Sequence, residues 1–158
     1  MNAKPATIAM NATIDFATHA DLEAMADLLS ELFALESDFR PERDKQLRGL
    51  RLILDTPPIG RLFVLRVEGE VAGMANALIT ISTAEGGPVL MVEDVIVKAG
   101  FRGRQFGRRL VEHVLDWARA NGMPRVTLLA DKDNAPALAF YERLGFAPSA
   151  MKVLRKTN

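Results

Sequence analysis

A segment rich in glycine and arginine, between an apolar strand and a helix, has the residue types of a phosphate-binding loop. It contains Gly103 and Gly107. Four arginines fall within eight residues: Arg102, Arg104, Arg108 and Arg109. Glycines let backbone N–H groups approach a phosphate, and a helix N-terminus adds partial positive charge. Since 20 Lys and Arg balance 20 Asp and Glu, the cluster is local, and it predicts a site for a phosphorylated ligand.

Two acidic residues interrupt the strand that precedes this segment. Glu93 and Asp94 lie in a run that is otherwise apolar, from Val89 to Val97. Alternation along a strand places their side chains on opposite faces of the sheet. A carboxylate in a buried strand costs free energy unless it is paired, hydrated or part of a site. The residues alone therefore leave open a functional site or a salt bridge at the strand end.

The composition excludes several classes of site. The chain has no Cys, so it has no disulfide, thiolate nucleophile or cysteine metal site. His19 and His113 are too far apart in sequence to indicate a metal cluster, and we expect no metal. Zero net charge argues against binding nucleic acid or a membrane through a basic face. No apolar run is long enough to span a membrane and no signal-peptide pattern is present, so we expect a cytoplasmic location.

The length of 158 residues predicts one domain, residues 12–158, after a weakly structured N-terminal tail, residues 1–11. Apolar periodicity and turn residues predict a mixed α/β domain in the order β-α-α-β-β-β-α-β-α-β. The expected strands span residues 13–17, 61–68, 71–83, 89–98, 125–130 and 146–154. The expected helices span residues 20–35, 42–55, 107–120 and 135–144.

Two motifs carry a resemblance to a known family. Neither the P-loop GxxxxGK[ST] nor the dinucleotide fingerprint GxGxxG is present. The run from Arg102 to Gly107, RGRQFG, instead resembles the [QR]xxGx[GA] loop of the GCN5-related N-acetyltransferase (GNAT) family, with Gln105 at the usual middle glycine. The run from Asn134 to Phe146 is similar to the family's NxxAxxFYxxxGF signature. Their order and element context support the same resemblance.

The resemblance implies a GNAT-type acyl-CoA N-acyltransferase fold, a central and mostly antiparallel sheet flanked by helices, with acetyl-CoA as cosubstrate. Backbone groups of the splayed strand would bind the pantetheine arm, and N–H groups of the loop would hold the pyrophosphate. A further contact would come from the start of the last helix. The implied cofactor-binding residues are Val95, Ile96, Val97, Arg102, Gly103, Arg104, Gln105, Phe106, Gly107, Arg108, Asn134 and Ala137.

The same resemblance assigns catalytic roles. Acetyl transfer needs a deprotonated amine, a stabilised carbonyl oxygen and a protonated leaving thiolate. A tyrosine at the position of Tyr141 acts as general acid in the family, and a phenol is protonated at pH 7. Glu93 would bind the acceptor amine or take its proton, while Asp94 would be structural. Glu36 resembles a substrate-side acidic residue of the polyamine (spermidine/spermine-type) acetyltransferases.

These assignments predict an N-acetyltransferase that moves an acetyl group by direct attack from acetyl-CoA to a primary amine of a small, cationic acceptor. Three alternatives remain open. The chain could be a CoA-binding regulatory module without catalysis, an interaction protein that keeps the fold alone, or an enzyme for protein N-termini or lysines. Homodimers are common in the family, and the sequence leaves the oligomeric state open.

Overall fold

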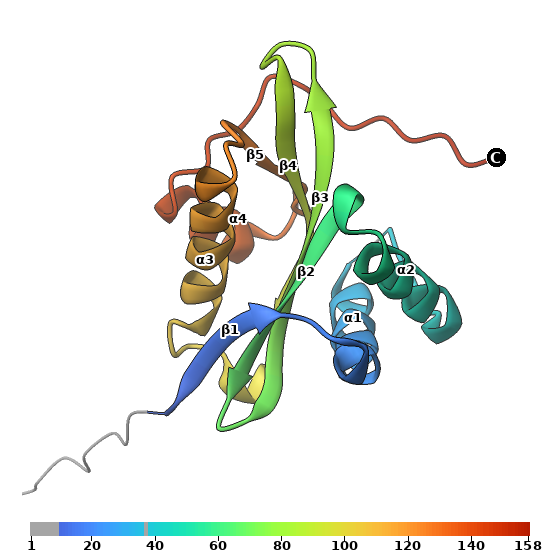
Figure 1. Ribbon diagram of the computed structural model, residues 1–158, viewed down its shortest axis with the longest axis vertical. Coiled ribbons are helices and arrows are strands. Elements are labelled where there is room, and N and C mark those ends of the chain that lie inside the picture. Colours follow the sequence, from blue (N-terminus) through green and yellow to red (C-terminus); the bar gives the residue numbers. More distant parts are fainter. Residues whose placement is uncertain (1–9, 37) are drawn as a thin grey trace, which may run out of the picture.

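The computed structural model describes residues 10–36 and 38–158 (Figure 1). Most of the predicted tail, residues 1–9, lies outside them, and the first strand begins at Ala12. The strands are β1 (Ala12–Phe16), β2 (Gly60–Val67), β3 (Glu70–Ser82), β4 (Gly87–Val97) and β5 (Val126–Leu128). The helices are α1 (Leu22–Leu35), α2 (Arg43–Asp55), α3 (Phe106–Ala120) and α4 (Ala135–Arg143). Among the described residues, no helix has both the length and the apolar character needed to cross a membrane.

The strands form one five-stranded sheet in the order β1-β2-β3-β4-β5. The pairings from β1 to β4 are antiparallel, and β5 joins β4 in parallel. A parallel pairing needs a crossover connection, which α3 supplies here. The hairpin between β2 and β3 turns at Glu68 and Gly69, both with positive φ (50° and 82°), as a tight two-residue turn requires. The sheet therefore has the mixed, mostly antiparallel character that the sequence predicted.

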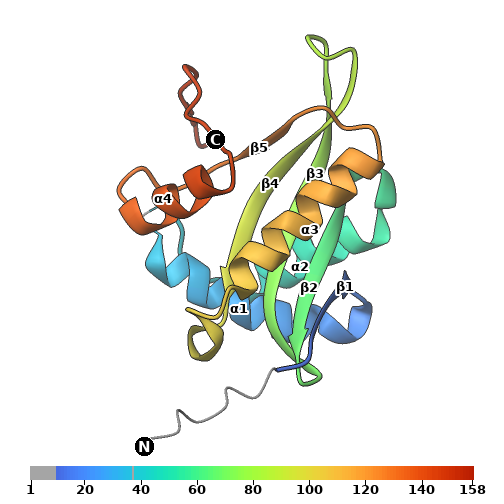
Figure 2. The same ribbon diagram turned by 90° about the vertical axis from the view of Figure 1, so that its left-hand side faces the viewer.

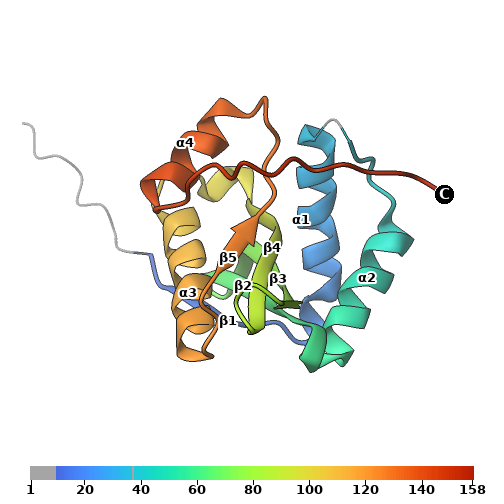
Figure 3. The ribbon, with the colours of Figure 1, turned by 90° about the horizontal axis from the view of Figure 1, so that it is seen from above.

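Helices cover both faces of this sheet (Figures 1 and 3). Alternate residues of the strands feed two separate cores. Phe63 of β2 packs in the core shared with α3, where Leu110 is fully buried. Val64, the next residue, packs in the core shared with α1 and α2, where Met25 is fully buried. Each of these helices thus packs one apolar face against the same strands. α3 covers one side of the sheet, and α1 and α2 cover the other.

The expected last strand, residues 146–154, is wrong. The chain after α4 has no regular structure, and Met151, Val153 and Leu154 are exposed. A strand needs a neighbouring edge to pair with, and β5 is only three residues long. Pro148 also lacks a backbone donor, so it could not complete a ladder. The segment instead crosses over the end of the sheet toward α1 and α2, as Figure 3 shows.

A buried carboxylate connects the start of α1 to β2. Asp21 is 4% exposed, and its carboxylate accepts hydrogen bonds from the backbone and hydroxyl of Thr18 (2.8 and 3.2 Å). The Arg66 guanidinium lies 2.9 Å away. Burial acts to raise the pKa of Asp21, but the bonds from Thr18 and the hydrogen bond and charge of Arg66 together lower it. The ionised form is therefore the one that the fold stabilises.

Replacing this carboxylate should destabilise the fold. Asp21→Asn leaves Arg66 without its counter-charge, and we expect a loss of about 3 kcal/mol in the free energy of unfolding. Because the pKa of Asp21 in the folded chain lies below its ordinary value of 3.8, this contribution is present above that pH and lost as the pH falls through the folded pKa. Urea denaturation at several pH values measures both effects.

The matched control is Asp15→Asn, which changes an exposed carboxylate of β1 and should have little effect on stability. Equal stabilities of the two variants at neutral pH would contradict the role assigned to Asp21.

Candidate active site

The strand β4 loses one of its neighbours halfway along its length. It pairs with β5 only from Leu90 to Val92, while its ladder with β3 continues to Val97. On the side away from β3, the backbone of Val95, Ile96 and Val97 therefore has no strand partner in the described part of the chain. This open edge lies beside α3 and α4 (Figure 2) and is available to an extended ligand.

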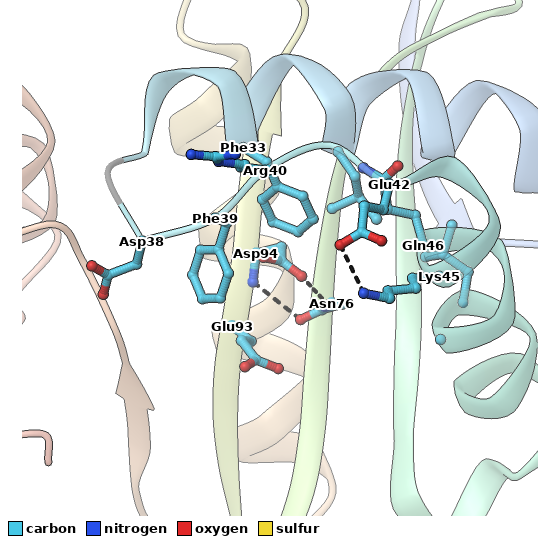
Figure 4. A pocket seen from close by; sticks show the side chains of 13 residues that line it. Phe33, Asp38, Phe39, Arg40, Glu42, Lys45, Gln46, Asn76, Glu93 and Asp94 are labelled. Carbon is cyan, nitrogen blue, oxygen red and sulfur yellow. Dashed lines mark hydrogen bonds and ion pairs between the residues drawn. The ribbon is translucent and has the colours of Figure 1, made fainter. Parts of the chain in front are cut away.

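A β-bulge in β4 changes the orientation of the two acidic residues. Asn76 pairs with Asp94 but the next residue, Ala77, pairs with Val92, so Glu93 is the extra residue. A bulge breaks the strict alternation of side chains. The prediction that Glu93 and Asp94 lie on opposite faces is therefore wrong, because both line one cleft on the α1 and α2 side of the sheet (Figure 4).

The loop after β4 presents a run of free backbone donors. Among the described residues, no N–H group from Gly103 to Arg108 donates a hydrogen bond within the chain, and the first bond of α3 runs from the Arg109 N–H to the Gln105 carbonyl (3.1 Å). Free N–H groups at a helix N-terminus form a site for anions such as phosphates. Gly103 has positive φ (75°), which turns the chain into this arrangement.

Gln105 adopts the conformation that the family usually gives to glycine. Its φ of 66° and ψ of 6° place it in the left-handed region immediately before α3. A side chain is strained there, by about 1 kcal/mol. The loop therefore keeps its shape despite the departure from the motif, at a small cost in stability.

The four loop arginines all contact other parts of the chain. The contacts are Arg102 Nε to the Val97 carbonyl (2.7 Å), Arg104 to Met10 Sδ (2.8 Å), Arg108 to Glu112 (2.7 Å) and Arg109 to the Ala12 carbonyl (2.9 Å). Arg109 ties α3 to β1 and has a structural role. The guanidinium groups are thus engaged within the chain, whereas the backbone N–H groups of the loop are free.

Tyr141 lies on α4 beside the point where β4 and β5 part. Asn134 caps this helix by accepting the Ala137 N–H (3.1 Å), and Gly145, with φ of 92°, ends it. The Tyr141 ring packs edge-on against Phe146 (5.8 Å between centroids) and lines a narrow cavity between β4, α3 and α4. Burial, and then the charge of Glu36, raise the pKa of Tyr141 to about 12. The phenol is therefore protonated at neutral pH.

Asp94 is held by a side chain from the neighbouring strand. The Asn76 amide donates to Asp94 Oδ2 (2.5 Å), and the Asn76 carbonyl oxygen accepts the Asp94 backbone N–H (3.1 Å). Burial is the main cause that raises the pKa of Asp94 to about 7, followed by the charges of Glu93 and Glu36. Asp94 is thus half protonated near neutral pH.

Glu36 lies immediately after the end of α1, at Leu35, and is electrostatically coupled to both sides of the site. Burial raises its pKa, and the charges of Asp131, Asp38 and Glu93 raise it further. Glu36 does not line the cleft that contains Glu93, but its charge acts on both Asp94 and Tyr141. The charge of Glu36, the residue chosen from the sequence, therefore helps to raise the pKa of both Asp94 and Tyr141.

Two cavities lie on opposite faces of β4 at its bulge. The larger, about 620 Å³, opens between α1, α2 and β4 and contains Glu93 and Asp94. The narrower one, on the other face, contains Val92, Val95 and Tyr141. Glu93 and Asp94 line the larger cavity, whereas Val92 and Val95, which flank them along the strand, line the narrower one. The two cavities are therefore separated here by the single strand β4.

The Acetyltransferase (GNAT) family model matches residues 22–146. The chain belongs to the GNAT family. Streptothricin acetyltransferase of Streptomyces lavendulae is 38% identical over 88 residues, which cover 55% of this chain and 44% of that protein. IAA acetyltransferase of Azospirillum brasilense is 34% identical over 125 residues, covering 79% and 78%. The chain thus spans less than half of the first relative and most of the second.

Solved GNAT structures have the same fold. An aminoglycoside N-acetyltransferase in complex with CoA superimposes with a TM-score of 0.80 at 19% identity, covering 96% of this chain and 97% of that one. At this identity the likeness supports the fold alone. It confirms the fold that the two sequence motifs predicted, while the match to the family model confirms the family.

The sequence indicates the residues of the larger cleft less clearly than it indicates those of the loop before α3. The sequence pattern assigns Asp94 a structural role and does not single out Asn76, yet both line the cleft with Glu93. An Asn in an apolar strand opposite an acidic residue is a usable signal, because buried polar groups require partners. Phe33 and Phe39, on α1 and the segment that follows it, also line this cleft. Nothing in helical periodicity separates such aromatic residues from core residues.

Relieving the backbone strain at residue 105 should stabilise the chain. We expect Gln105→Gly to raise the free energy of unfolding by about 0.5–1 kcal/mol, because glycine adopts the left-handed conformation without a Cβ clash. Urea denaturation without ligand measures this. The matched variant Gln105→Ala keeps a Cβ and should not raise the free energy of unfolding. Equal increases in both variants would contradict the backbone strain assigned to residue 105.

Proposed function

We propose that this GNAT domain transfers an acetyl group from acetyl-CoA to the primary amine of a small, cationic acceptor. The observation that carries the proposal is the arrangement at residues 92–95 of β4, where the cleft of Glu93 and Asp94 lies on one face of the strand and Tyr141, beside its open edge, on the other. One side offers unpaired backbone groups and a phenol, and the other offers two carboxylates. Holding both reactants at one point is a large part of catalysing their reaction.

The chain has the features that acetyl-CoA requires. The free N–H groups from Gly103 to Arg108 suit a pyrophosphate, and the open edge of β4 at Val95–Val97 suits the amides of a pantetheine arm. A Cβ built on Gly107 would lie 3.6 Å from the nearest atom, in the Phe140 ring, so the protein itself does not need a glycine there. The glycine instead keeps the helix start open toward a ligand. Acetyl-CoA supplies the acetyl group as a thioester.

The carboxylate pair, Glu93 and Asp94, takes the proton of the acceptor amine. An ammonium group has no lone pair and must lose a proton before it attacks. Burial, followed by the charges of Glu93 and Glu36, raises the pKa of Asp94 to about 7. Asp94 can therefore accept and release a proton near neutral pH, as a general base must.

Tyr141 donates a hydrogen bond to the leaving sulfur. Its raised pKa, about 12, keeps the proton on the phenol oxygen throughout the neutral range. One backbone N–H of the open β4 edge polarises the acetyl carbonyl. The amine attacks directly, so no covalent intermediate with the protein forms.

A relative named for streptothricin supports a small-molecule acceptor. A regulatory module that only binds CoA would have no need for the carboxylate pair opposite Tyr141.

Binding of acetyl-CoA should raise the melting temperature of the protein. Ligand at about 100 times its dissociation constant adds roughly 2.7 kcal/mol, a shift of roughly 5–10 °C for a chain of this size. Adenosine 3′,5′-bisphosphate is the control for the nucleotide part. Gly107→Ala should leave the melting temperature without ligand equal or higher, while weakening acetyl-CoA binding at least about tenfold. An unchanged melting temperature with saturating acetyl-CoA would contradict the proposed function.

The pH dependence of turnover separates the two catalytic groups. We expect kcat/KM to fall below about pH 7, since protonation of Asp94 removes a proton acceptor from the site. Asp94→Asn should move this limb to lower pH. Tyr141→Phe should lower kcat about 100-fold without moving the limb. Thiol release from acetyl-CoA measures both; a limb that Asp94→Asn leaves in place would contradict the pair.

A further inference from the structure

The large cleft has a polar wall and an aromatic wall that face each other at the β4 bulge (Figure 4). Its polar end is this bulge, where Glu93, Asp94 and Asn76 lie together. Phe33 and Phe39 approach this end from the opposite wall, as Figure 4 shows. The apolar lining consists of Leu29, Phe33, Phe39 and Leu50. A ligand bound at this end therefore meets carboxylates on one wall and phenyl rings on the other.

The two phenyl rings form a ready apolar surface. Their centroids lie 5.4 Å apart at an interplanar angle of 39°, a tilted pair. Phe33 is on α1, and Phe39 lies in the segment before α2 and is 42% exposed. Covering an exposed aromatic ring with an apolar group is favourable, since it removes hydrocarbon surface from water.

The acidic residues at the rim of the cleft already have cationic partners. Glu42 pairs with Lys45 (2.7 Å), and Asp38 pairs with Arg155 of the C-terminal segment (3.0 Å). Arg40 also lines the cleft and adds a positive charge. The rim therefore offers a second ammonium group only carboxylates that are already paired.

The polar end accommodates one cation. The Asn76 amide is taken by Asp94, through bonds of 2.5 and 3.1 Å, so it offers little to hydroxyl groups of a sugar. The free acceptors at this end are carboxylate oxygens of Glu93 and Asp94, which suit an ammonium group. The place for a positive charge is therefore also the place of the proposed chemistry.

We propose that the acceptor is a primary monoamine with an aromatic or branched aliphatic body, its ammonium at Glu93 and Asp94 and its body against Phe33 and Phe39. This inference rests on the proposed acetyl transfer and narrows its acceptor. The cleft volume of about 620 Å³ is within the range of pockets that enclose molecules of this size.

Polyamines fit poorly, because the rim carboxylates of Asp38 and Glu42 already have cationic partners. Amino sugars fit poorly, because the Asn76 amide is occupied by Asp94 and offers little to hydroxyl groups.

A panel of amines tests the inference by thiol release from acetyl-CoA. The apolar monoamines are 2-phenylethylamine, tryptamine and isoamylamine; the polar amines are spermidine, glucosamine and kanamycin. We expect kcat/KM for the best apolar monoamine to exceed that of every polar amine at least about tenfold. A polar amine that is used as well or better overturns the inference but leaves the acetyltransferase function intact.

Variants of the aromatic wall sharpen the test. Phe39→Ala should lower kcat/KM for 2-phenylethylamine about 10- to 100-fold, mainly through KM, and change that for ethylamine less than about threefold. Phe39→Leu should restore most of the loss. The matched control Phe16→Ala removes a half-exposed phenyl ring from β1, outside the cleft, and should change neither value. Equal losses for both amines in Phe39→Ala would overturn the packing against Phe39.

Failure of the proposed function gives a different result. No thiol release with any amine would overturn acetyl transfer, and the inference about its acceptor would fall with it. The acetyl-CoA melting shift then separates a chain that only binds the cosubstrate from one that does not bind it.

Discussion

β4 has a full ladder with β3 but only three paired residues with β5, and the positions of the site depend on this difference. A strand buried between two neighbours has no free backbone groups to offer. Where β5 ends at Leu128, β4 keeps its rigidity on one side and gains free donors and acceptors on the other. The bulge at Glu93 lies at the same place, so the sheet changes its pairing and its side-chain order together. Loop, cavities and carboxylates are all arranged around that point.

The ionisable groups of the site affect one another's pKa values through their charges in a poorly hydrated environment, rather than through direct contacts. Burial raises the pKa of Asp94, Glu36 and Tyr141, and each negative charge makes the next ionisation harder. Such a cluster costs folding free energy, because the carboxylates would be better hydrated in an unfolded chain. Asn76 reduces this cost by donating to Asp94. Bringing a cationic acceptor to the cleft would relieve it further, which couples acceptor binding to the protonation of the site.

Sequence patterns predicted the elements whose signals are local. The helices α1 and α3 and the strands β2 and β3 lie within one or two residues of their expected ranges, because apolar periodicity and turn residues depend on residues close in sequence. The prediction of the last strand failed because a strand depends on a distant edge, and the alternation of Met151 and Val153 contains no information about one. Alternation also misplaced Glu93 and Asp94, since a bulge depends on how two strands fit.

The sequence predicted those parts of the candidate site that lie within its two motifs. The loop before α3 and Tyr141 are each fixed by a short run of residues, so a single chain contains their signal. The larger cleft is assembled from α1, the segment that follows it, α2, β3 and β4, which are far apart in the sequence. Its aromatic wall therefore could not be separated from the ordinary apolar residues of a helix.

Tyr141 and Trp117 provide two intrinsic spectroscopic probes at different places in the protein. The chain has one tyrosine and one tryptophan. Tyr141 lines the narrow cavity of the site, whereas Trp117 packs edge-on against Phe16 and Phe63, near β1 and β2. Phenolate absorbance therefore reports on one known group in the site, and indole fluorescence reports on the opposite edge of the sheet. Events at the two places can be followed separately in the unlabelled protein.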